Sequence, residues 1–368
     1  MHMPYLWPQA ALTLFLSITA CMAQAQSRPD SAALRAVPKV VAEAYVSPEA
    51  PSEEFDSLAT WRHPDGSTWL IATAKSSHRL VVFDADTGTR LREIGSKGRE
   101  PGQFFRPNGI AVLGDRLFVA ERDNRRVQGF SLPDFRPLGT FGESELRSPY
   151  GLWLNARNDG TLDIFVTDSF MEGPRYDIVP PFDQLDQRVR RYRLDFDQQG
   201  MIVARTLGSF GDTDETTALR IVESIAGDAR RGTLMIADED QRHESTLREY
   251  GQDGRSTGRS VPRASFESEA EGVALWACGR KGGYWIAVDQ LQTLTVFRLF
   301  DRASLAARGS FTGATVAATD GINLRTAPSR RFPSGALYAV HRDKSVAAFD
   351  LRDIVSAFAG SMLFLFGL

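Results

Sequence analysis

Two short apolar runs and the polar turn between them decide the fold of this chain, and they read Leu117-Phe-Val-Ala-Glu-Arg-Asp-Asn-Arg-Arg-Val-Gln-Gly-Phe130. β-Branched and aromatic residues favour strands, and the Asp-Asn pair between the runs favours a turn. Runs of the same kind, such as Trp69–Thr73 and Leu80–Asp84, recur at intervals of about ten residues, with Gly, Asp and Asn between them. This spacing predicts β-hairpins and an all-β fold.

The pair of strands also recurs with a longer period. It occurs at Leu70–Asp84, Leu117–Phe130, Ile164–Tyr192, Leu234–Tyr250, Tyr284–Phe297 and Leu337–Phe349. Six pairs over about 290 residues give one unit per roughly 45–60 residues, which is the length of a four-stranded propeller blade. We therefore predict a six-bladed β-propeller. A β-sandwich, or two small sandwiches, is the alternative, because it would also consist of short strands and turns.

The N-terminal segment has the features of an export signal. Residues 10–20 are apolar but too few for a mature membrane helix, and Ala23-Gln24-Ala25 has the small-x-small form of a signal-peptidase site. We predict a signal peptide at residues 1–25, a linker or N-terminal arm rich in Ala, Pro and Ser at 26–52, and a propeller domain at 53–368. A second interpretation of the leader is a bacterial lipobox, Ile18-Thr19-Ala20-Cys21, in which Cys21 carries a lipid anchor. Both interpretations predict an exported protein, which is periplasmic, extracellular or an outer-membrane lipoprotein.

Charge and cysteine content limit the partners. The formal net charge of −3 argues against a non-specific nucleic-acid binder, although Arg and Lys gathered locally can still bind an anionic substrate. Of the two cysteines, Cys21 lies in the leader, so Cys278 has no intramolecular partner and no disulfide framework is expected. We expect a monomer.

The sequence leaves open how the propeller closes. The strand that completes the last blade comes either from residues near 40–48 or from the C-terminal tail. The apolar end of that tail, residues 358–368, is too short to span a membrane, and we interpret it as a buried closing segment.

One blade resembles a repeat of the NHL propellers. The stretch Gly98–Val112 contains Gly-Gln-Phe and Pro-Asn-Gly-Ile-Ala-Val, and Leu117–Phe130 contains Asn-Arg-Arg-Val. This resemblance covers a single blade. It supports one hypothesis for the function, namely a propeller without catalysis that presents one face to a protein or a cell-wall ligand.

A second resemblance extends over nearly the whole chain. Seven segments follow one another across about 280 residues in the order found in the β-propeller phytases: Asp56–Trp61, Thr73–Lys75 with Leu80–Asp84, Tyr150–Trp153, Glu223 with Leu234–Asp240, Glu269–Gly272 with Gly283–Ala287 and Gln290, Thr319–Asn323, and Phe332–Gly335. The sequence departs from that family at Ser224, where the family has glycine, and at Asn323, where it has a carboxylate.

The second resemblance implies a calcium-dependent phosphomonoester hydrolase, similar to a 3-phytase, that releases phosphate from myo-inositol hexakisphosphate (phytate) or a related phosphorylated small molecule. Calcium takes oxygen ligands, neutralises clustered carboxylates and lowers the pKa of a bound water. The matching positions imply catalysis by Glu223, Glu271 and Asp238, substrate binding by Lys75 and Gln290, and calcium binding by Asp56, Glu239, Glu269 and Asp320. Arg122 lies outside the seven segments, and we predict that it also binds substrate because a guanidinium suits a bidentate contact with phosphate. The NHL-like pattern gives the alternative, in which Arg122 is a surface turn residue.

Overall fold

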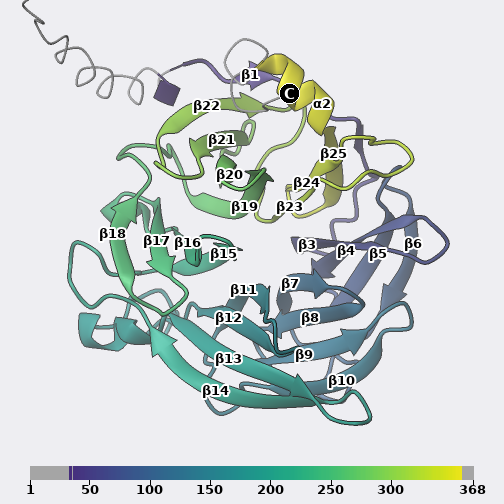
Figure 1. Cartoon of the computed structure of the whole chain (residues 1–368), viewed down its shortest axis with the longest axis vertical. Helices are drawn as coiled ribbons and strands as arrows, with labels where there is room; N and C mark the ends of the chain where they lie inside the picture. The colour runs from purple at the N-terminus through teal and green to yellow at the C-terminus, as the bar shows by residue number, and fades with distance from the viewer. Residues whose placement is uncertain (1–32, 35, 359–368) are drawn as a thin grey trace, which may run out of the picture.

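The strands of the chain form six small sheets arranged in a ring around a central axis (Figure 1). The computed structural model describes residues 33–34 and 36–358. Each blade contains four antiparallel strands, so the prediction of a six-bladed β-propeller is confirmed and the sandwich alternative, which needs two packed sheets, is excluded. The predicted signal peptide, Cys21 and the apolar tail from residue 359 lie outside the described residues.

The blades follow one another along the chain, and within most of them the strands run from the axis outward. Blade 1 consists of β3 (Phe55–Arg62), β4 (Thr68–Ala74), β5 (Arg79–Asp84) and β6 (Arg90–Ile94). Blade 2 consists of β7 (Pro107–Leu113), β8 (Arg116–Glu121), β9 (Arg126–Ser131) and β10 (Arg136–Phe141). Blade 3 consists of β11 (Pro149–Ala156), β12 (Leu162–Asp168), β13 (Val189–Phe196) and β14 (Ile202–Phe210). Blade 4 consists of β15 (Val222–Asp228), β16 (Thr233–Asp238), β17 (Thr246–Gly251) and β18 (Ser256–Ser260). Blade 5 consists of β19 (Ala270–Cys278), β20 (Gly282–Asp289), β21 (Val296–Asp301) and β22 (Ala307–Thr312). Blade 6 consists of β23 (Ile322–Arg325), β24 (Ala336–His341), β25 (Ser345–Asp350) and β2 (Tyr45–Val46).

The hydrophobic core is divided among the six interfaces between neighbouring blades. Phe165 of blade 3, for example, packs with Ile236 and Tyr250 of blade 4. Similar clusters fill the other interfaces, and they include Trp61 and Trp285. The second strands are therefore covered on both faces, and every residue of β4 and β12 is buried. The outermost strands are the most exposed, as β6 shows. This layout explains why the second strands are continuous apolar runs in the sequence.

The N-terminal segment closes the ring. β2 pairs antiparallel with β25 and is the outermost strand of the last blade, so the closing strand comes from the N-terminal side of the two alternatives. β1 (Lys39–Val40) adds in parallel to β22 as a fifth strand of blade 5. Between them, the Glu43 carboxylate accepts the backbone N–H groups of residues 314–316 at 2.8–3.1 Å. The segment predicted as an arm outside the propeller thus supplies two of its strands, and the boundary expected at residue 53 lies too far along the chain.

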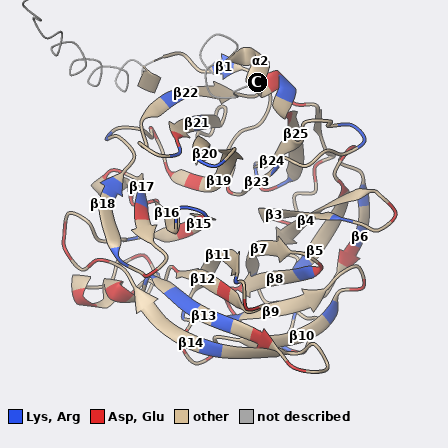
Figure 2. Cartoon of the chain, in the orientation of Figure 1, with Lys and Arg blue, Asp and Glu red and all other residues tan. Residues whose placement is uncertain are grey.

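Helical structure is confined to short segments. The η1 (Phe182–Gln187) and η2 (Gln241–His243) turns lie in loops, and α2 (Leu351–Ala357) follows the last strand, where its first turn is capped by the Asp350 carboxylate. None of the helices in the described part of the chain has the length and hydropathy of a membrane span. Basic and acidic segments are interspersed over the outer strands (Figure 2).

Candidate functional site

Six side chains at equivalent positions of the inner strands gather at one end of the central axis. In five inner strands the pairing register shifts near the start of the strand, as between Phe55 and Leu58 of β3. Such β-bulges re-aim side chains. In each inner strand we consider the residue two positions before the point from which the strand pairs regularly with the second strand. These six residues occupy equivalent places in the six blades, and we call them the channel ring: Asp56, Asn108, Tyr150, Glu223, Glu271 and Asp320.

A small residue follows each member of the channel ring, either glycine or serine. A Cβ atom at Gly321 would lie 2.4 Å from the carbonyl oxygen of Asp56, and one at Gly151 would lie 2.3 Å from the carbonyl oxygen of Glu223. Larger residues would therefore push neighbouring inner strands apart. The glycines allow the close approach that brings the ring side chains together.

A second set of residues reaches the same end from the position after the second strand of each blade. We call it the outer layer: Lys75, Arg122, Ser169, Glu239, Gln290 and Arg342. In five blades the backbone N–H of this residue donates to the carbonyl two positions before the ring residue, as from Glu239 to Ile221 (2.9 Å) and from Gln290 to Glu269 (3.0 Å). This repeated hydrogen bond holds the outer layer level with the channel ring.

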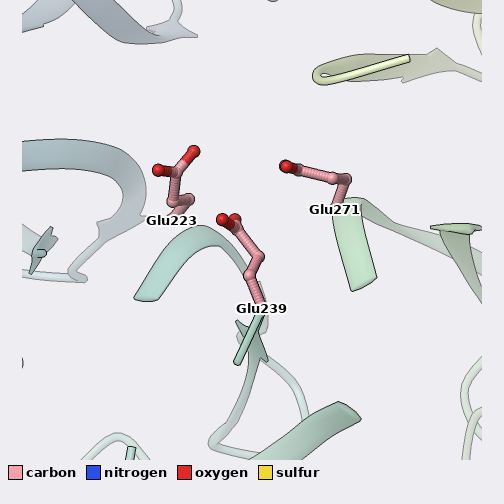
Figure 3. A group of neighbouring side chains, drawn as sticks. All are labelled: Glu223, Glu239 and Glu271. Atoms are coloured by element: carbon pink, nitrogen blue, oxygen red, sulfur yellow. The ribbon is translucent and has the colours of Figure 1, made fainter. Parts of the chain in front are cut away.

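Three glutamates from these two sets converge (Figure 3): Glu223 and Glu271 of the ring and Glu239 of the outer layer. Their carboxylate oxygens lie within 4.8 Å of one another. Glu239 is buried, and its Oε1 atom has no hydrogen-bond partner. No Lys or Arg in the part of the chain that the structure describes forms an ion pair with any of the three, which we call the glutamate cluster.

Burial and mutual repulsion make the glutamate cluster costly to ionise. Burial raises the pKa of all three carboxyls, and neighbouring carboxylates raise it further, as Glu223 and Glu271 do for Glu239. For Glu223, Lys75 and a hydrogen bond from the Tyr150 hydroxyl oppose the rise. Three converging carboxylates, one of which has a buried oxygen that no described group contacts, offer the oxygen ligands that a hard divalent cation prefers. The residues present therefore fit a calcium ion.

The adjacent part of the ring, which blades 6 and 1 form, already contains a cation. The Lys75 ammonium lies 3.0 Å from Asp56 Oδ2 and 3.1 Å from Asp320 Oδ2. Gln290 Nε2 donates to the other oxygen of Asp320 at 2.5 Å, and Ser57 donates to Asp56 at 2.7 Å. We call Lys75, Asp56 and Asp320 the lysine–aspartate group.

Charge balance keeps Lys75 protonated. Burial opposes its charge, but Asp56 and Asp320 outweigh that effect and raise its pKa well above the usual range. Burial also raises the pKa of Asp320, to about 7, although Lys75 pulls it down. Lys75 is thus an internal counterion, and its ammonium contacts Asp56 and Asp320, with Glu54 Oε1 at 3.8 Å.

A small cavity of ≈ 10 Å³ separates the glutamate cluster from the lysine–aspartate group. It is lined by Asp56, Tyr150, Glu223, Glu271 and Asp320, with the small residues beside them. That space suits about one water molecule or one ion.

Arg122 lies in a larger pocket between blades 2 and 3. The pocket has a volume of ≈ 580 Å³ and is lined by Arg122, Asp123, Arg125, Arg147, Ser148, Arg175 and Tyr176. We call it the arginine pocket. The Arg122 guanidinium donates to Asp123 at 2.8 Å, whereas the Nε and Nη2 atoms of Arg147 are buried without a partner. Four guanidinium groups and two unused donors suit an anionic ligand.

Asp238 and Glu269 do not join the glutamate cluster. The Asp238 carboxylate accepts the backbone N–H groups of Arg220 (3.0 Å) and Ile221 (3.1 Å), so it holds the loop before β15. Neighbouring residues of a strand point to opposite sides, and Glu239 is therefore the one that faces the axis. On this geometry Asp238 holds a loop and does not reach the glutamate cluster, so no contact in the structure supports the catalytic role predicted for it. Glu269 lies half-buried at the rim.

Three residues of the site had no role in the sequence analysis: Asn108, Tyr150 and Arg147. Asn108 is fully buried, and both of its side-chain polar atoms lack a partner. A signal for the first two exists, because each ring residue precedes a glycine or serine and then an apolar residue. Aligning that triplet across the blades would have identified the whole ring. Nothing comparable marks Arg147.

Comparison with known proteins extends to architecture alone. No family model matches the chain, and no curated protein matches it. Solved structures that align with it include a nidogen/laminin complex (TM-score 0.48, 17% identity, covering 75% of this chain and 87% of that chain) and Kuenenia stuttgartiensis hydrazine synthase (TM-score 0.48, 14% identity, 86% and 82%). The Dos1 propeller also aligns (TM-score 0.43, 12% identity, 84% and 72%). Similarities this low carry no information about the site.

Proposed function

We propose that this propeller is a calcium-dependent phosphomonoester hydrolase, similar to the β-propeller phytases, that acts on phytate or a related phosphorylated small molecule. The observation that carries the proposal is the glutamate cluster beside the arginine pocket. Ser148 lines that pocket and stands two residues before Tyr150 of the channel ring, so the two features are neighbours at one end of the propeller. Metal-assisted hydrolysis of a phosphate ester needs a cation site and an anion site in that arrangement.

The glutamate cluster is the proposed calcium site. Ca²⁺ takes six to eight oxygen ligands, and three carboxylates supply up to six. Glu223, Glu239 and Glu271 would hold the ion, and it would supply positive charge for phosphate oxygens and acidify a water molecule. The sequence analysis assigned Asp56 and Asp320 to calcium. Both are already paired with Lys75, so we propose that they hold the Lys75 ammonium in the ring instead.

The remaining steps belong to the side chains. Arg122 and Arg147 bind phosphate oxygens at the mouth of the arginine pocket and orient the ester toward the glutamates. Water attacks phosphorus, the ester P–O bond breaks, and inorganic phosphate and an alcohol leave. A carboxylate oxygen of Glu223 or Glu271 accepts a proton from the attacking water, and the proton passes to the leaving oxygen, which departs as the alcohol.

The direct test is phosphate release from calcium phytate by the purified protein, with and without excess chelator. We expect calcium-dependent release that falls by at least about 100-fold in Glu271→Gln, since general-base catalysis contributes about that much. Glu143→Gln is the matched control, because Glu143 is exposed and lies outside the site. No release at any calcium concentration, from protein that is folded by circular dichroism, would overturn the proposal and favour a non-catalytic, NHL-like binding propeller.

A further inference from the structure

Two neighbouring hairpins extend from the other end of the propeller. β15 turns into β16 at residues 229–232, and β19 turns into β20 at residues 279–281. Glu223 precedes the end of β15 by five residues, which corresponds to about 17 Å of extended strand. The two hairpin turns are therefore well separated from the glutamate cluster and the arginine pocket.

Four basic residues at these turns line a surface depression of ≈ 1210 Å³: Arg230, Arg231, Arg280 and Lys281. All four are exposed. Within the described chain, none of them pairs with a carboxylate side chain. We call these residues the basic platform. Their concentration is notable because the whole chain has a formal net charge of −3.

The nearest carboxylate is already engaged elsewhere. Asp228 receives two hydrogen bonds from the Arg302 guanidinium at 2.6 and 2.7 Å, and both side chains are almost fully buried. Its Oδ1 atom also accepts the backbone N–H groups of Arg230 (3.1 Å) and Arg231 (3.2 Å). The charge of the platform therefore stays uncompensated.

The same contacts fix the shape of the platform. Arg302 belongs to blade 5 and also donates to the carbonyl of Gly282, so the buried pair joins the two hairpins. The Arg230 guanidinium adds a second link, because it donates to the carbonyl of Gly279 at 3.0 Å. The basic side chains are thus presented from two turns whose relative position is set by buried hydrogen bonds.

We propose that the basic platform docks the protein on a linear polymer that carries closely spaced phosphate groups. Exposed charges are screened, and each contact with one phosphate contributes little. A polymer contacts several cations at once and releases its counterions, which makes the sum favourable. The volume of the depression also exceeds the roughly 300–1,000 Å³ that is typical of small-molecule pockets. Docking at this end leaves the glutamate cluster open, so the proposal is independent of the hydrolase assignment.

Two other occupants fit less well. Sites for single-stranded nucleic acid combine cations with aromatic side chains on which bases stack, and the four lining residues include no aromatic residue. An anionic membrane presents a broad surface, whereas the platform lines a depression between two hairpin turns, which suits a narrow polymer better.

The experiment measures binding of the mature protein to fluorescently labelled linear polyphosphate over a range of salt concentrations, with chelator present. The double variant Arg231→Glu/Lys281→Glu is expected to bind at least about tenfold more weakly and to show a shallower salt dependence. Its control is Arg136→Glu/Arg205→Glu, which changes the net charge equally at exposed positions of β10 and β14. The control is expected to bind within about twofold of the parent protein.

A further variant, Arg122→Gln/Arg147→Gln, tests whether the polymer binds at the arginine pocket instead. Loss of binding in that variant but not in Arg231→Glu/Lys281→Glu would overturn the proposal. Equal loss in the Arg136→Glu/Arg205→Glu control, or no binding by the parent protein at low salt, would do the same. Tighter binding to vesicles of anionic lipid or to single-stranded DNA than to polyphosphate would identify one of the other occupants.

Discussion

The lysine–aspartate group and the glutamate cluster draw on neighbouring parts of one channel ring, blades 6 and 1 for the first and blades 4 and 5 for the second, yet their charge balance differs. Both draw carboxylates from the ring, namely Asp56 and Asp320 on one side and Glu223 and Glu271 on the other. The outer layer makes the difference, because it adds Lys75 to the first pair and Glu239 to the second. A single position after the second strand thus decides whether two buried carboxylates carry their own counterion.

The two sides should therefore contribute to stability in opposite ways. A buried ion pair gives little net stability, but removing one partner leaves an uncompensated buried charge. The glutamate cluster has repulsion in place of a partner, so it should destabilise the protein until protons or a cation compensate for it. Substitutions on the two sides can test this contrast directly.

The largest effect is expected for Lys75→Met. This substitution leaves Asp56 and Asp320 buried without their cation and should lower the free energy of unfolding by about 3–5 kcal/mol. The measurement is urea unfolding in the presence of chelator. Lys97→Met is the control, because Lys97 is exposed and its ammonium lies over the ring of Phe105, a contact worth about 1 kcal/mol or less. Equal effects of the two substitutions would contradict the assignment of Lys75 as an internal counterion.

The next effect is the change in stability that calcium and single substitutions cause. Substitutions in the glutamate cluster and in the lysine–aspartate group should change the stability of the calcium-free protein in opposite directions. At a concentration of 100 times its dissociation constant, calcium should stabilise the parent protein by about 2.7 kcal/mol. Glu239→Gln should abolish that gain and stabilise the calcium-free protein by about 1 kcal/mol, because it removes a repelling charge. Asp320→Asn should instead destabilise the calcium-free protein, since Lys75 loses a partner. Thermal unfolding with calcium and with chelator checks both signs, and the same sign for both variants would refute the contrast.

A third and smaller effect is the pH dependence of the calcium-free protein. The pKa of Asp320 is raised from 3.8 to about 7, and burial raises that of each member of the glutamate cluster. A raised pKa means that the folded state holds the proton more tightly than the unfolded state, so this stability is present at low pH and is lost as pH rises through about 7. With chelator, the free energy of unfolding should fall by about 2 kcal/mol between about pH 5 and about pH 8.

Calcium should flatten that profile, because the cation replaces the protons of the glutamate cluster. Thermal unfolding across the pH range, with matched ionic strength, is the measurement. A chelated protein that is most stable at pH 8 would show that the carboxyls are compensated in another way.

The repeated strand pairs were enough to predict the six blades, because each pair fills one interface of the ring and its apolar residues recur with the blade. The closing strand was harder, since Tyr45–Val46 is only two residues long and its role depends on pairing with β25, about 300 residues away. No local pattern distinguishes such a strand from a linker. Glu43, which ties the segment to the loop at residues 314–316, has no sequence signature either.

The site was predictable in its residue types but not in its pairings. Each of the four carboxylates of the channel ring lies in a segment that resembles the phytase family, so the sequence analysis named all four as site residues. Asp238 and Glu239 are adjacent in the sequence, and only the strand direction shows which one faces the axis. The contact of Lys75 with Asp320 joins blades 1 and 6, a closure that a linear pattern does not contain.

The smallest effect is expected at Asn108, which tests where the boundary between the two sides lies. Asn108 follows Asp56 around the channel ring, and its buried amide has no hydrogen-bond partner among the residues that the structure describes. Asn108→Leu should stabilise the protein by about 1 kcal/mol, because an uncompensated polar group is replaced by an apolar side chain of similar size. Asn323→Leu is the matched contrast, since Asn323 accepts a hydrogen bond from Thr60 at 2.9 Å and its substitution should destabilise the protein.

Stabilisation by calcium should be unchanged in Asn108→Leu, because the glutamate cluster lies in blades 4 and 5. A reduced response to calcium would place Asn108 among the groups that serve the cation and would extend its site across the ring.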